Sequence, residues 1–412
     1  MKIERLKVRN FKSFKHLDCK LSDFNVLIGP NASGKSNFVS IFKFLRDISK
    51  EGLINAISLQ GGPEYIFNIN STRDESLQIE VYIDSGVGIG SSPPTIRQES
   101  SIYLSNLVYK LELQFYKSSP KLKKFAEEVS LTKRKVSDRK TDPQGLKSES
   151  EVILIRNVQG KLSYEGNLGE LLETMIFRGT SSDGNFDGSL LNLFPITIFI
   201  QPNVGGLFDP VQVYDFDPKL SKKAIPLSGL AELESDGRNS ALILKRLLES
   251  KPKRERFIRL LKTCLPFVER MEIENLTDSS ILFKIAETYN TNRPIPSPLI
   301  SDGTIELVSM IYALYFDNKK VVIMEEPERN IHPHIVSRLI ELIKDASKDK
   351  QIILTTHSPE VLKTVNLEDV ITLKRDTVGN SLLEKIKEKK DILLFLQDQI
   401  GIEDIFTDGI LN

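Results

Sequence analysis

The sequence predicts an α/β protein in which a mixed or parallel sheet is flanked by helices, with an antiparallel β lobe and a helical insert added. Three observations support this class. Residues 29–36 form a glycine-bracketed loop, segments 77–83 and 107–115 alternate between apolar and polar residues, and the last third alternates strands with helices. Strand–helix alternation is typical of parallel sheets, whereas alternation with period two is typical of half-buried antiparallel strands.

The glycine-bracketed loop predicts a nucleotide-phosphate site. It consists of Gly29, Pro30, Asn31, Ala32, Ser33, Gly34, Lys35 and Ser36, and Asn37 follows it. Backbone N–H groups of such a loop surround phosphates, Lys35 reaches the β- and γ-phosphates, and the Ser36 hydroxyl faces Mg²⁺. The apolar run 25–28 predicts a strand entering the loop, and residues 37–45 predict a helix whose positive end points at the phosphates. We therefore expect ATP and Mg²⁺ as ligands.

A second strand supplies an acidic half of the same site. The apolar run 321–324 has the pattern of a buried central strand, and it carries Glu325 and Glu326 to the carboxyl edge of the sheet, beside the loop. We expect Glu325 to approach Mg²⁺, directly or through water, and Glu326 to polarise the water that attacks the γ-phosphate. An acidic pair is usually surface charge, but its place between an apolar strand and Pro327 favours catalysis.

Two further turns are candidates for the site. His357 follows the apolar strand 352–354, and its position at a strand end favours a role as γ-phosphate sensor, although a lone histidine is more often structural. Ser301, Asp302 and Gly303 precede a predicted helix. Ser301 is expected to cap that helix, and the amides of the turn could bind an anion; a cap with no further role is the alternative.

Composition restricts the class of protein. The 56 basic and 56 acidic residues balance, so net charge provides no general attraction to nucleic acid. Only Cys19 and Cys264 are present, which favours a reducing compartment over a disulfide scaffold or a cysteine-based zinc site. His332 and His334 could ligate a metal, but no further His or Cys completes such a site. The sequence shows no leader pattern and no run long enough for a membrane span, so we expect a soluble, cytoplasmic protein.

The polar stretch 117–150 is rich in basic residues. They are Lys121, Lys123, Lys124, Lys133, Arg134, Lys135, Arg139 and Lys140. Such a cluster could contact a nucleic-acid backbone. We favour a solvated loop or hairpin extension, because Glu127, Glu128, Asp138 and Asp142 dilute the charge.

We expect one head over residues 1–412, in four parts. These are an N-terminal lobe with the phosphate loop (1–85), a β-rich and polar insert (86–235), a helical subdomain (236–300) and a C-terminal lobe (301–412). Residues 240–268 predict two helices, and the proline-rich stretch 290–300 predicts a loop. Further expected elements are helices at 304–316 and 335–346, strands at 351–354 and 370–373, and a closing strand and helices over 382–400.

Taken in order, the segments GPNASGKS, SDGT, EEPERNIHP and TTHSP resemble motifs of the soluble ABC-type ATPases of the RecF, SMC and OLD group. The likeness is to the small stand-alone AAA "predicted ATPase" members, of the kind found in DNA repair and anti-phage defence. It covers most of the chain and includes the opening VRNFKSF and the DGRNS segment at 236–240.

The resemblance implies an ABC-type ATPase head and a mode of assembly. Ser301, Asp302 and Gly303 would belong to the signature motif, which meets the γ-phosphate of a partner subunit's ATP in a head-to-tail homodimer. Lys12 resembles a basic residue near the nucleotide. The residues beyond His357 are too few for a separate nuclease domain. We therefore expect a switch that acts on a separate effector protein, with DNA as a candidate partner and no membrane partner.

Three departures from the family pattern bear on the site. Ala32 stands where the family often has glycine, a mild change if the backbone φ is negative there. Glu325 replaces the usual Asp, so the magnesium geometry would be looser. The glutamine that links the lobes is not assigned between Gln60 and Gln201.

The alternative function is the ATP-binding subunit of a membrane transporter. The SDGT signature, the NIHP segment and the long insert weigh against it.

Overall fold

The computed structural model describes residues 1–72, 75–84, 87–89, 100–116, 121–137, 149–166, 188–192 and 206–384. The chain divides into two compact units. The first comprises Met1–Ser22, Asn37–Val211 and Leu373–Glu384, and the second comprises Asp23–Ser36, Gln212–Thr372 and Lys385–Asn412. Gln201, Arg139, Lys140 and the elements expected after residue 384 lie outside the described residues.

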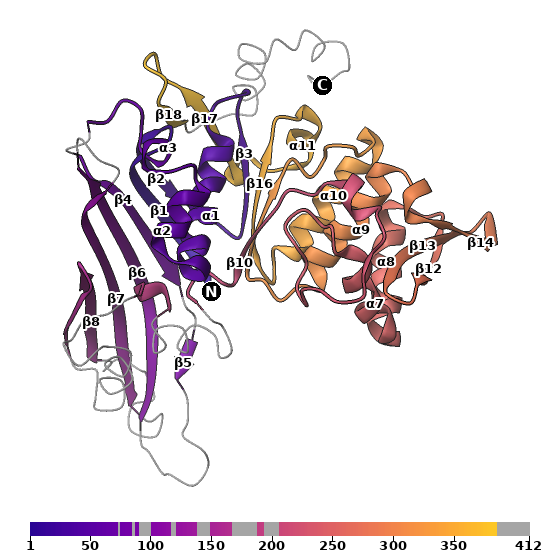
Figure 1. The fold of residues 1–412 in the computed structure, drawn as a ribbon, viewed down its shortest axis with the longest axis horizontal. Coiled ribbons are helices and arrows are strands. Elements are labelled where there is room, and N and C mark those ends of the chain that lie inside the picture. Colours follow the sequence, from indigo (N-terminus) through magenta and orange to yellow (C-terminus); the bar gives the residue numbers. More distant parts are fainter. Residues whose placement is uncertain are drawn as a thin grey trace. The chain divides into compact units, whose positions relative to one another are not determined.

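The first unit is built on an eight-stranded sheet with the order β2-β1-β4-β6-β7-β8-β9, in which β5 pairs with β6 (Figure 1). The strands are β1 (Lys2–Phe11), β2 (Phe14–Lys20), β4 (Leu77–Asp84), β5 (Val87–Ile89), β6 (Ser100–Phe115), β7 (Leu122–Ser137), β8 (Glu149–Val158) and β9 (Lys161–Glu165). All of these pairings are antiparallel. The predicted period-two strands at 77–83 and 107–115 are confirmed as parts of β4 and β6.

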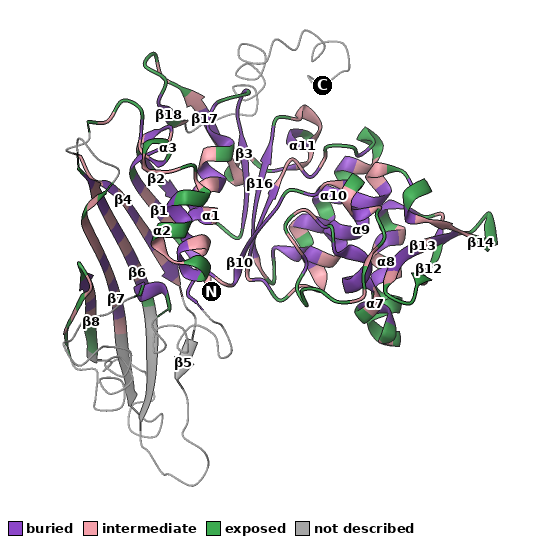
Figure 2. Ribbon diagram, viewed as in Figure 1, coloured by how far each residue is buried: buried purple, intermediate pink, exposed green. Residues whose placement is uncertain are grey.

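One face of this sheet is apolar and the other is polar. Leu77, Ile79, Val81 and Ile83 of β4 are buried while the residues between them are half-buried (Figure 2). Helix α1 (Lys35–Glu51) contributes to the apolar core, since the ring centroids of Phe44 and of Phe11 on β1 lie 5.9 Å apart. Short helices α2 (Leu53–Leu59) and α3 (Pro63–Ile66) and the 3₁₀ turn η1 (Leu190–Asn192) complete the described part of the unit.

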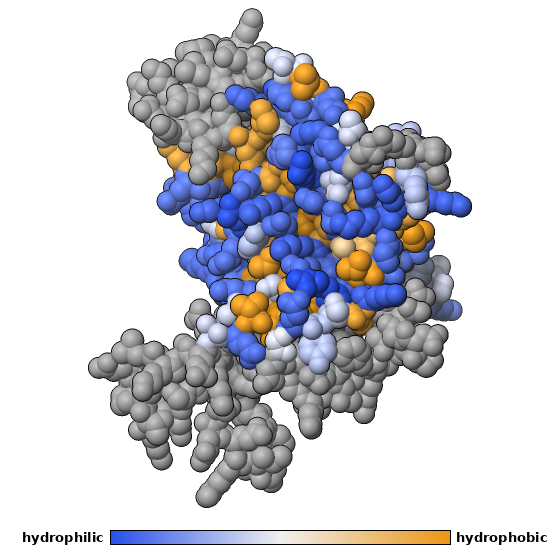
Figure 3. Space-filling model, turned by 90° about the vertical axis from the view of Figure 1, so that its left-hand side faces the viewer, coloured by the Kyte–Doolittle hydropathy of each residue, from blue (hydrophilic) through white to orange (hydrophobic). Residues whose placement is uncertain are grey.

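The basic stretch of the insert is a strand over 122–137, so the hairpin-extension interpretation is confirmed there and a loop is wrong. Two of its charged side chains pair with the neighbouring strand β6: Lys124 Nζ lies 2.6 Å from Glu112 Oε2, and Glu128 Oε1 lies 2.8 Å from Lys110 Nζ. Figure 3 shows a largely hydrophilic surface over the described residues on this side, with hydrophobic residues scattered. Opposite charges placed side by side stabilise a solvated sheet face and lower its net field.

The second unit contains most of a six-stranded sheet with the order β10-β15-β16-β3-β17-β18. The strands are β3 (Phe24–Ile28), β10 (Val211–Tyr214), β15 (Val321–Glu325), β16 (Gln351–Thr356), β17 (Val370–Arg375) and β18 (Ser381–Glu384). Strands β15, β16, β3 and β17 are parallel, as predicted. Because parallel neighbours share an edge, β3, β15 and β16 bring their carboxyl ends together although residues 28 and 325 are far apart in sequence.

The helices of the second unit share a core with this sheet (Figure 1). They are α6 (Pro218–Ser221), α7 (Ser240–Glu249), α8 (Lys251–Cys264), α9 (Asp302–Tyr315), α10 (Pro333–Ala346) and α11 (Pro359–Thr364), with 3₁₀ turns η2 (Ser297–Leu299) and η3 (Leu367–Asp369). The two helices predicted within 240–268 are confirmed. None of the helices in the described ranges combines the length and apolar composition needed to cross a bilayer.

A four-stranded sheet was missed by the sequence analysis. It consists of β11 (Ile225–Pro226), β12 (Val268–Thr277), β13 (Ser280–Glu287) and β14 (Asn290–Pro296). The predicted loop at 290–300 is therefore wrong for 290–296, and the expected helical subdomain contains strands. Among the described strands, β14 pairs with β13 alone, and prolines are tolerated on such an edge because one side of the strand needs no ladder hydrogen bonds.

Candidate functional site

The phosphate loop leaves β3 in a conformation that places two residues in the left-handed region. Gly34 has φ 113° and Ala32 has φ 61°. An alanine there costs about 1–2 kcal/mol relative to right-handed backbone, because Cβ crowds the following carbonyl oxygen. The condition under which Ala32 would be a mild replacement for glycine is thus not met, and this position favours glycine.

Lys35 is drawn into the loop. Its Nζ donates to the carbonyl oxygens of Gly29 at 2.6 Å and Pro30 at 3.1 Å. Burial lowers the pKa of Lys35, while the carboxylates of Glu326 and Glu328 act in the opposite direction. The loop cation is therefore in electrostatic contact with the acidic segment that follows β15.

The acidic pair lies at the end of β15, as predicted, and the strand stops at Glu325. Glu326 has φ 47°, and its N–H donates to the carbonyl oxygen of Thr355 at 2.9 Å. This change of backbone conformation takes Glu326 out of the strand. Its Oε1 lies 3.0 Å from Nδ1 of His357, which follows β16. The structure thus brings together Glu326 and His357, which the sequence predicted as site residues in two separate segments.

Glu328 is a third carboxylate, which the sequence analysis did not assign. Its Oε1 accepts a hydrogen bond from the Thr356 hydroxyl, and the Thr356 oxygen accepts one from the N–H of Ser358 at 2.9 Å. Its Oε2 is buried without a hydrogen-bond partner in the described part of the chain. Burial raises the pKa of Glu328. The spacing EEPE was visible in the sequence, but it does not indicate which way the third carboxylate turns.

The turn at the start of α9 behaves as a helix cap, as predicted. Ser301 Oγ accepts from the N–H of Thr304 at 3.4 Å, and Asp302 forms an ion pair with Lys222. Gly303 is required by close approach, because a Cβ there would lie 2.4 Å from the carbonyl oxygen of Asn330. The start of α9 therefore packs directly on the segment that follows the acidic pair.

A hydrogen bond reinforces this packing. Asn330 has φ 65°, and its Nδ2 donates to Oε2 of Glu306 at 3.0 Å. Glu306 is 2% exposed, and burial raises its pKa to about 7. The segment after β15 is thus joined to α9 by one side-chain bond and one glycine contact.

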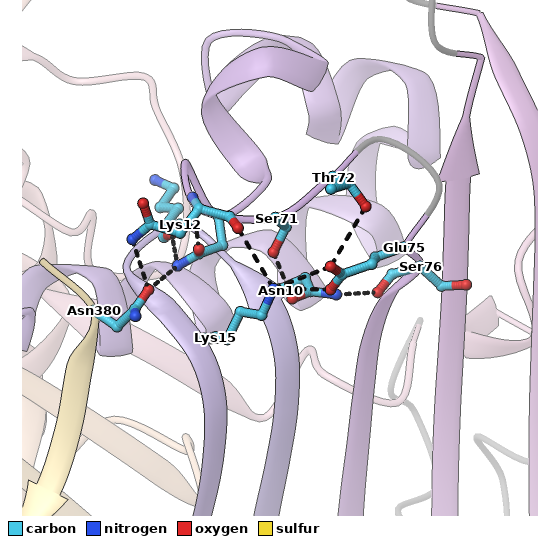
Figure 4. A network of polar contacts seen from close by, with 10 residues as sticks. Asn10, Lys12, Lys15, Ser71, Thr72, Glu75, Ser76 and Asn380 are labelled. Atoms are coloured by element: carbon cyan, nitrogen blue, oxygen red, sulfur yellow. Dashed lines mark hydrogen bonds and ion pairs between the residues drawn. The ribbon is translucent and has the colours of Figure 1, made fainter. Parts of the chain in front are cut away.

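Lys12 and Asn37 belong to the first unit. Lys12 has φ 46°, and its N–H donates to the carbonyl oxygen of Ile66. The carbonyl oxygen of Lys12 accepts from the side chain of Asn68 and belongs to the network of Figure 4. Burial lowers the pKa of Lys12. Asn37 donates to Ser13 Oγ at 2.8 Å. These bonds hold the backbone of Lys12 and the side chain of Asn37 around the β1–β2 turn.

The polar network of Figure 4 holds that turn. Asn10, which has φ 58°, donates to the carbonyl oxygen of Ser76 and accepts from the Ser71 hydroxyl. Asn68 also donates to Asn380 at 3.2 Å. These bonds stabilise backbone conformations that are unfavourable for residues other than glycine.

The two adjacent histidines have a structural explanation. His332 caps α10, and its Nδ1 accepts from the N–H of His334 at 3.4 Å. Over the described ranges, no group of three or more His, Cys, Asp or Glu side chains is arranged to hold a metal ion.

Gln60, one of the two candidates for the glutamine that links the lobes, lies at the C-terminal cap of α2, in the first unit.

The side chains at the sheet edge suit a nucleotide with a hard divalent cation. The loop supplies Lys35 and a backbone with left-handed φ at residues 32 and 34, which suit phosphate groups. The Ser36 hydroxyl and the Glu325 carboxylate are oxygen ligands of the kind that Mg²⁺ prefers. The buried Oε2 of Glu328 is an additional acceptor in the same region. Together with the parallel strand order, this site defines the class: the chain has the fold of an ABC-type ATPase head of the RecF and SMC kind.

Comparison with known families identifies the family to which the chain belongs. Residues 24–363 match the AAA_21 family, described as "AAA domain, putative AbiEii toxin, Type IV TA system". The match covers most of the chain, and the chain belongs to this family. It is also 22% identical over 143 residues to the uncharacterized protein MJECL43 of Methanocaldococcus jannaschii, a match spanning 32% of this chain and 37% of that protein.

One solved structure supports the fold. An SMC head bound to the C-terminal winged-helix domain of ScpA superposes with a TM-score of 0.50 at 16% identity, covering 95% of this chain and 100% of that one. The SMC head domain of Thermotoga maritima gives a TM-score of 0.42 at 15% identity, covering 94% and 100% of the respective chains. At these identities the likeness concerns architecture alone.

Proposed function

We propose that this protein hydrolyses ATP to ADP and phosphate and acts as a nucleotide-dependent switch. The observation that carries the proposal is the pairing of Glu326 with His357, 3.0 Å apart at the carboxyl ends of β15 and β16, together with the coupling of Glu326 to Lys35. A carboxylate held by hydrogen bonding beside a phosphate-loop lysine is the arrangement that hydrolysis of a γ-phosphate requires.

In the proposed reaction Glu326 is the general base. Its carboxylate orients a water and accepts a proton as the water oxygen bonds to the γ-phosphorus and the bond to the β–γ bridging oxygen breaks. His357 keeps Glu326 in position and is suited to sense the γ-phosphate. Lys35 and the N–H groups of residues 29–34 stabilise the phosphate charge.

Ser36 and Glu325 are the residues that we propose to hold Mg²⁺. A bound Mg²⁺ neutralises charge on the phosphate oxygens. Glu325 is one methylene longer than the Asp usually found at such a place. Asn37, which follows Ser36 in the chain, and Lys12 are proposed to contribute to nucleotide binding.

The proposal includes a head-to-tail homodimer that closes on ATP. Ser301, Asp302 and Gly303, at the positive end of α9, would meet the γ-phosphate held by the partner subunit. The exposed Ser301 and the cap that fixes the turn support this assignment. The rate of hydrolysis would then depend on dimer formation, because each site is completed by a second copy of the chain.

The biological setting that we propose is a DNA-associated or anti-phage process, in a soluble, cytoplasmic protein that acts through a separate effector. The matched family is described with a type IV toxin–antitoxin system, and a head of similar fold has been solved with a bound partner protein. Both facts support a role in which the ATPase controls another component.

The experiment that tests this function measures the molecular mass in solution of the Glu326→Gln variant with and without ATP. The measurement is then repeated with duplex DNA. The variant should bind ATP, hydrolyse it about 10²–10⁴ times more slowly, and shift from monomer to dimer on adding ATP. Lys35→Ala is the matched control and should stay monomeric. Hydrolysis at the wild-type rate would refute the role of Glu326, and a size unchanged by ATP would refute the switch. Binding of the ATP-bound dimer to DNA would support the DNA-associated branch.

A further inference from the structure

The segment after β15 is tied to the end of β16 at two levels. At the backbone, the N–H of Glu326 donates to the carbonyl oxygen of Thr355. At the side chains, Glu328 accepts from the Thr356 hydroxyl, which itself accepts from the N–H of Ser358. These contacts flank His357 on both sides, so they determine where its ring lies relative to Glu326.

The turn that carries Glu328 is itself well defined. Pro327 restricts the backbone after Glu326, the N–H of Arg329 donates to the carbonyl oxygen of Glu326 at 3.0 Å, and the N–H of Ile331 donates to that of Glu328 at 3.0 Å. Ile331 is buried, which anchors the far end of the turn. Glu328 therefore presents its carboxylate from a fixed backbone.

The carboxylate is incompletely satisfied for a purely structural residue. One oxygen has the Thr356 hydroxyl, whereas Oε2 is buried with no donor among the described residues. A buried acceptor without a donor typically costs about 1–3 kcal/mol. Glu328 also interacts electrostatically with Lys35 and with His357. A residue that is costly for stability and lies among the proposed reacting groups points to a functional role.

We propose that Glu328 is a positioning residue for ATP hydrolysis: through its hydrogen bond with Thr356 it holds the ends of β15 and β16 together and sets the place of His357 beside Glu326. This inference rests on the proposed ATPase function. Glu328 itself takes no proton from water and binds no phosphate. Its effect therefore belongs to the rate of the chemical step and not to nucleotide affinity, because small misplacements of reacting groups slow catalysis strongly.

The kinetic test compares variants that keep or remove the hydrogen bond. Glu328→Ala and Thr356→Val remove it and should lower kcat by about 10- to 100-fold, with KM and calorimetric ATP affinity within about threefold of wild type. Glu328→Gln keeps an acceptor oxygen and Thr356→Ser keeps the hydroxyl, so both should retain kcat within about threefold. Glu360→Gln, on the neighbouring α11, is the matched control for loss of a glutamate charge and should leave kcat unchanged.

A second readout needs no nucleotide. The chain has 4 histidines, so the ring resonances of His16, His332, His334 and His357 can be followed individually by NMR after assignment with a His357→Gln variant. Thr356→Val should shift the His357 resonances and leave those of the other three in place, whereas Thr356→Ser should shift none of them.

Three results would overturn the inference. Glu328→Ala with wild-type kcat would show that the residue has no part in hydrolysis. Equal losses in Glu328→Gln and Glu328→Ala would show that charge, not the hydrogen bond, is responsible. An unmoved His357 in Thr356→Val would show that the bond does not position the ring. If wild-type protein hydrolyses no ATP, the proposed function fails, but the NMR comparison still decides whether Glu328 and Thr356 position His357.

Discussion

Two glutamates in different regions of the molecule have buried carboxylate oxygens, and they differ in hydrogen bonding. Glu127, on β7 in the first unit, is 1% exposed and accepts from the hydroxyls of Tyr109 and Ser189, the N–H of Leu190 and the amide of Asn157. Glu328, after β15, has the Thr356 hydroxyl on one oxygen and no partner on the other among the described residues.

We interpret the difference as one between a carboxylate buried for stability and a carboxylate buried for the proposed function. Burial raises the pKa of both glutamates, so the pKa direction does not distinguish them. The hydrogen-bond donors distinguish them. Both carboxylate oxygens of Glu127 accept hydrogen bonds, and these bonds join β6, β7, β8 and the segment at 189–190. A saturated carboxylate stabilises the fold, whereas the carboxylate of Glu328 is incompletely satisfied and lies among the groups of the proposed site, which agrees with the positioning role proposed for it. The following substitutions test this contrast.

Removing the loop cation should have the largest effect on the site and little on the fold. Lys35→Ala should weaken ATP binding by at least roughly 100-fold, since it deletes the charged donor to the phosphates. Its hydrogen bonds in the structure go to loop carbonyls, which can turn to solvent, so the free energy of unfolding should change by less than about 1 kcal/mol. Calorimetry and urea unfolding measure the two quantities, and unchanged ATP affinity would contradict the phosphate-loop assignment.

Removing the saturated carboxylate should have the opposite pattern. Glu127→Ala should lower the free energy of unfolding by about 3 kcal/mol, because it leaves several buried donors without an acceptor. Per folded molecule, ATP affinity and kcat should stay within about threefold of wild type. Glu128→Ala is the matched control: this half-exposed neighbour pairs with Lys110 and Arg156 at the surface and should cost less than about 1 kcal/mol. Equal losses in the two variants would contradict a special role for the buried carboxylate.

Glu306 provides an intermediate case with a pH dependence. Its pKa is raised to about 7, so the folded protein binds a proton that the unfolded chain releases above its ordinary carboxyl pKa. Stability should therefore fall as pH rises from about 5 to about 8. Glu306→Gln keeps an acceptor for Asn330 and should remove this fall, with a gain on the order of 2 kcal/mol at the upper end. Urea unfolding across the pH range measures it, and parallel curves for variant and wild type would contradict the shift.

The smallest expected effect concerns loop strain. Ala32→Gly should raise the free energy of unfolding by up to about 1 kcal/mol, because glycine adopts φ 61° without the crowding of a Cβ, partly offset by the entropy of glycine in the unfolded chain. Ala56→Gly, in the buried part of helix α2, is the control and should be destabilising by about 1 kcal/mol. A loss of stability in Ala32→Gly would contradict the strain.

Local patterns predicted most of the elements near the site. The strand–loop–helix order at 24–51, the strand before Glu325, and the strand before His357 all follow from apolar runs with glycine or polar residues at their ends. Strands β12 and β14 were missed because polar and proline residues obscure their alternation, and β13 is a short apolar run without strict alternation, since it is buried between them. The alternation in β12 is weak for this reason, and burial there depends on β13 and the helices.

Residues whose roles depend on contacts could not be predicted in the same way. Gly303 looked like part of a cap, and only its approach to the carbonyl oxygen of Asn330 makes a side chain impossible there. Glu328 looked like one more acidic residue after Pro327. Its partner Thr356 lies on another strand, so no local spacing could connect them.

By itself the sequence determined the chemistry that this protein carries: a lysine in a glycine-bracketed loop, two carboxylates after an apolar strand, and a histidine after another. Local periodicity and turn composition encode such features, because they depend on neighbours a few residues away. Only the tertiary structure decided that Glu326 meets His357, that Glu328 turns toward Thr356, and that Glu127 is saturated. Parallel pairing of β15 with β16 brings the first two pairs together, whereas antiparallel pairing of β6, β7 and β8 surrounds Glu127. Such pairing joins segments far apart in sequence, such as β3 and β16, whose register no local pattern specifies.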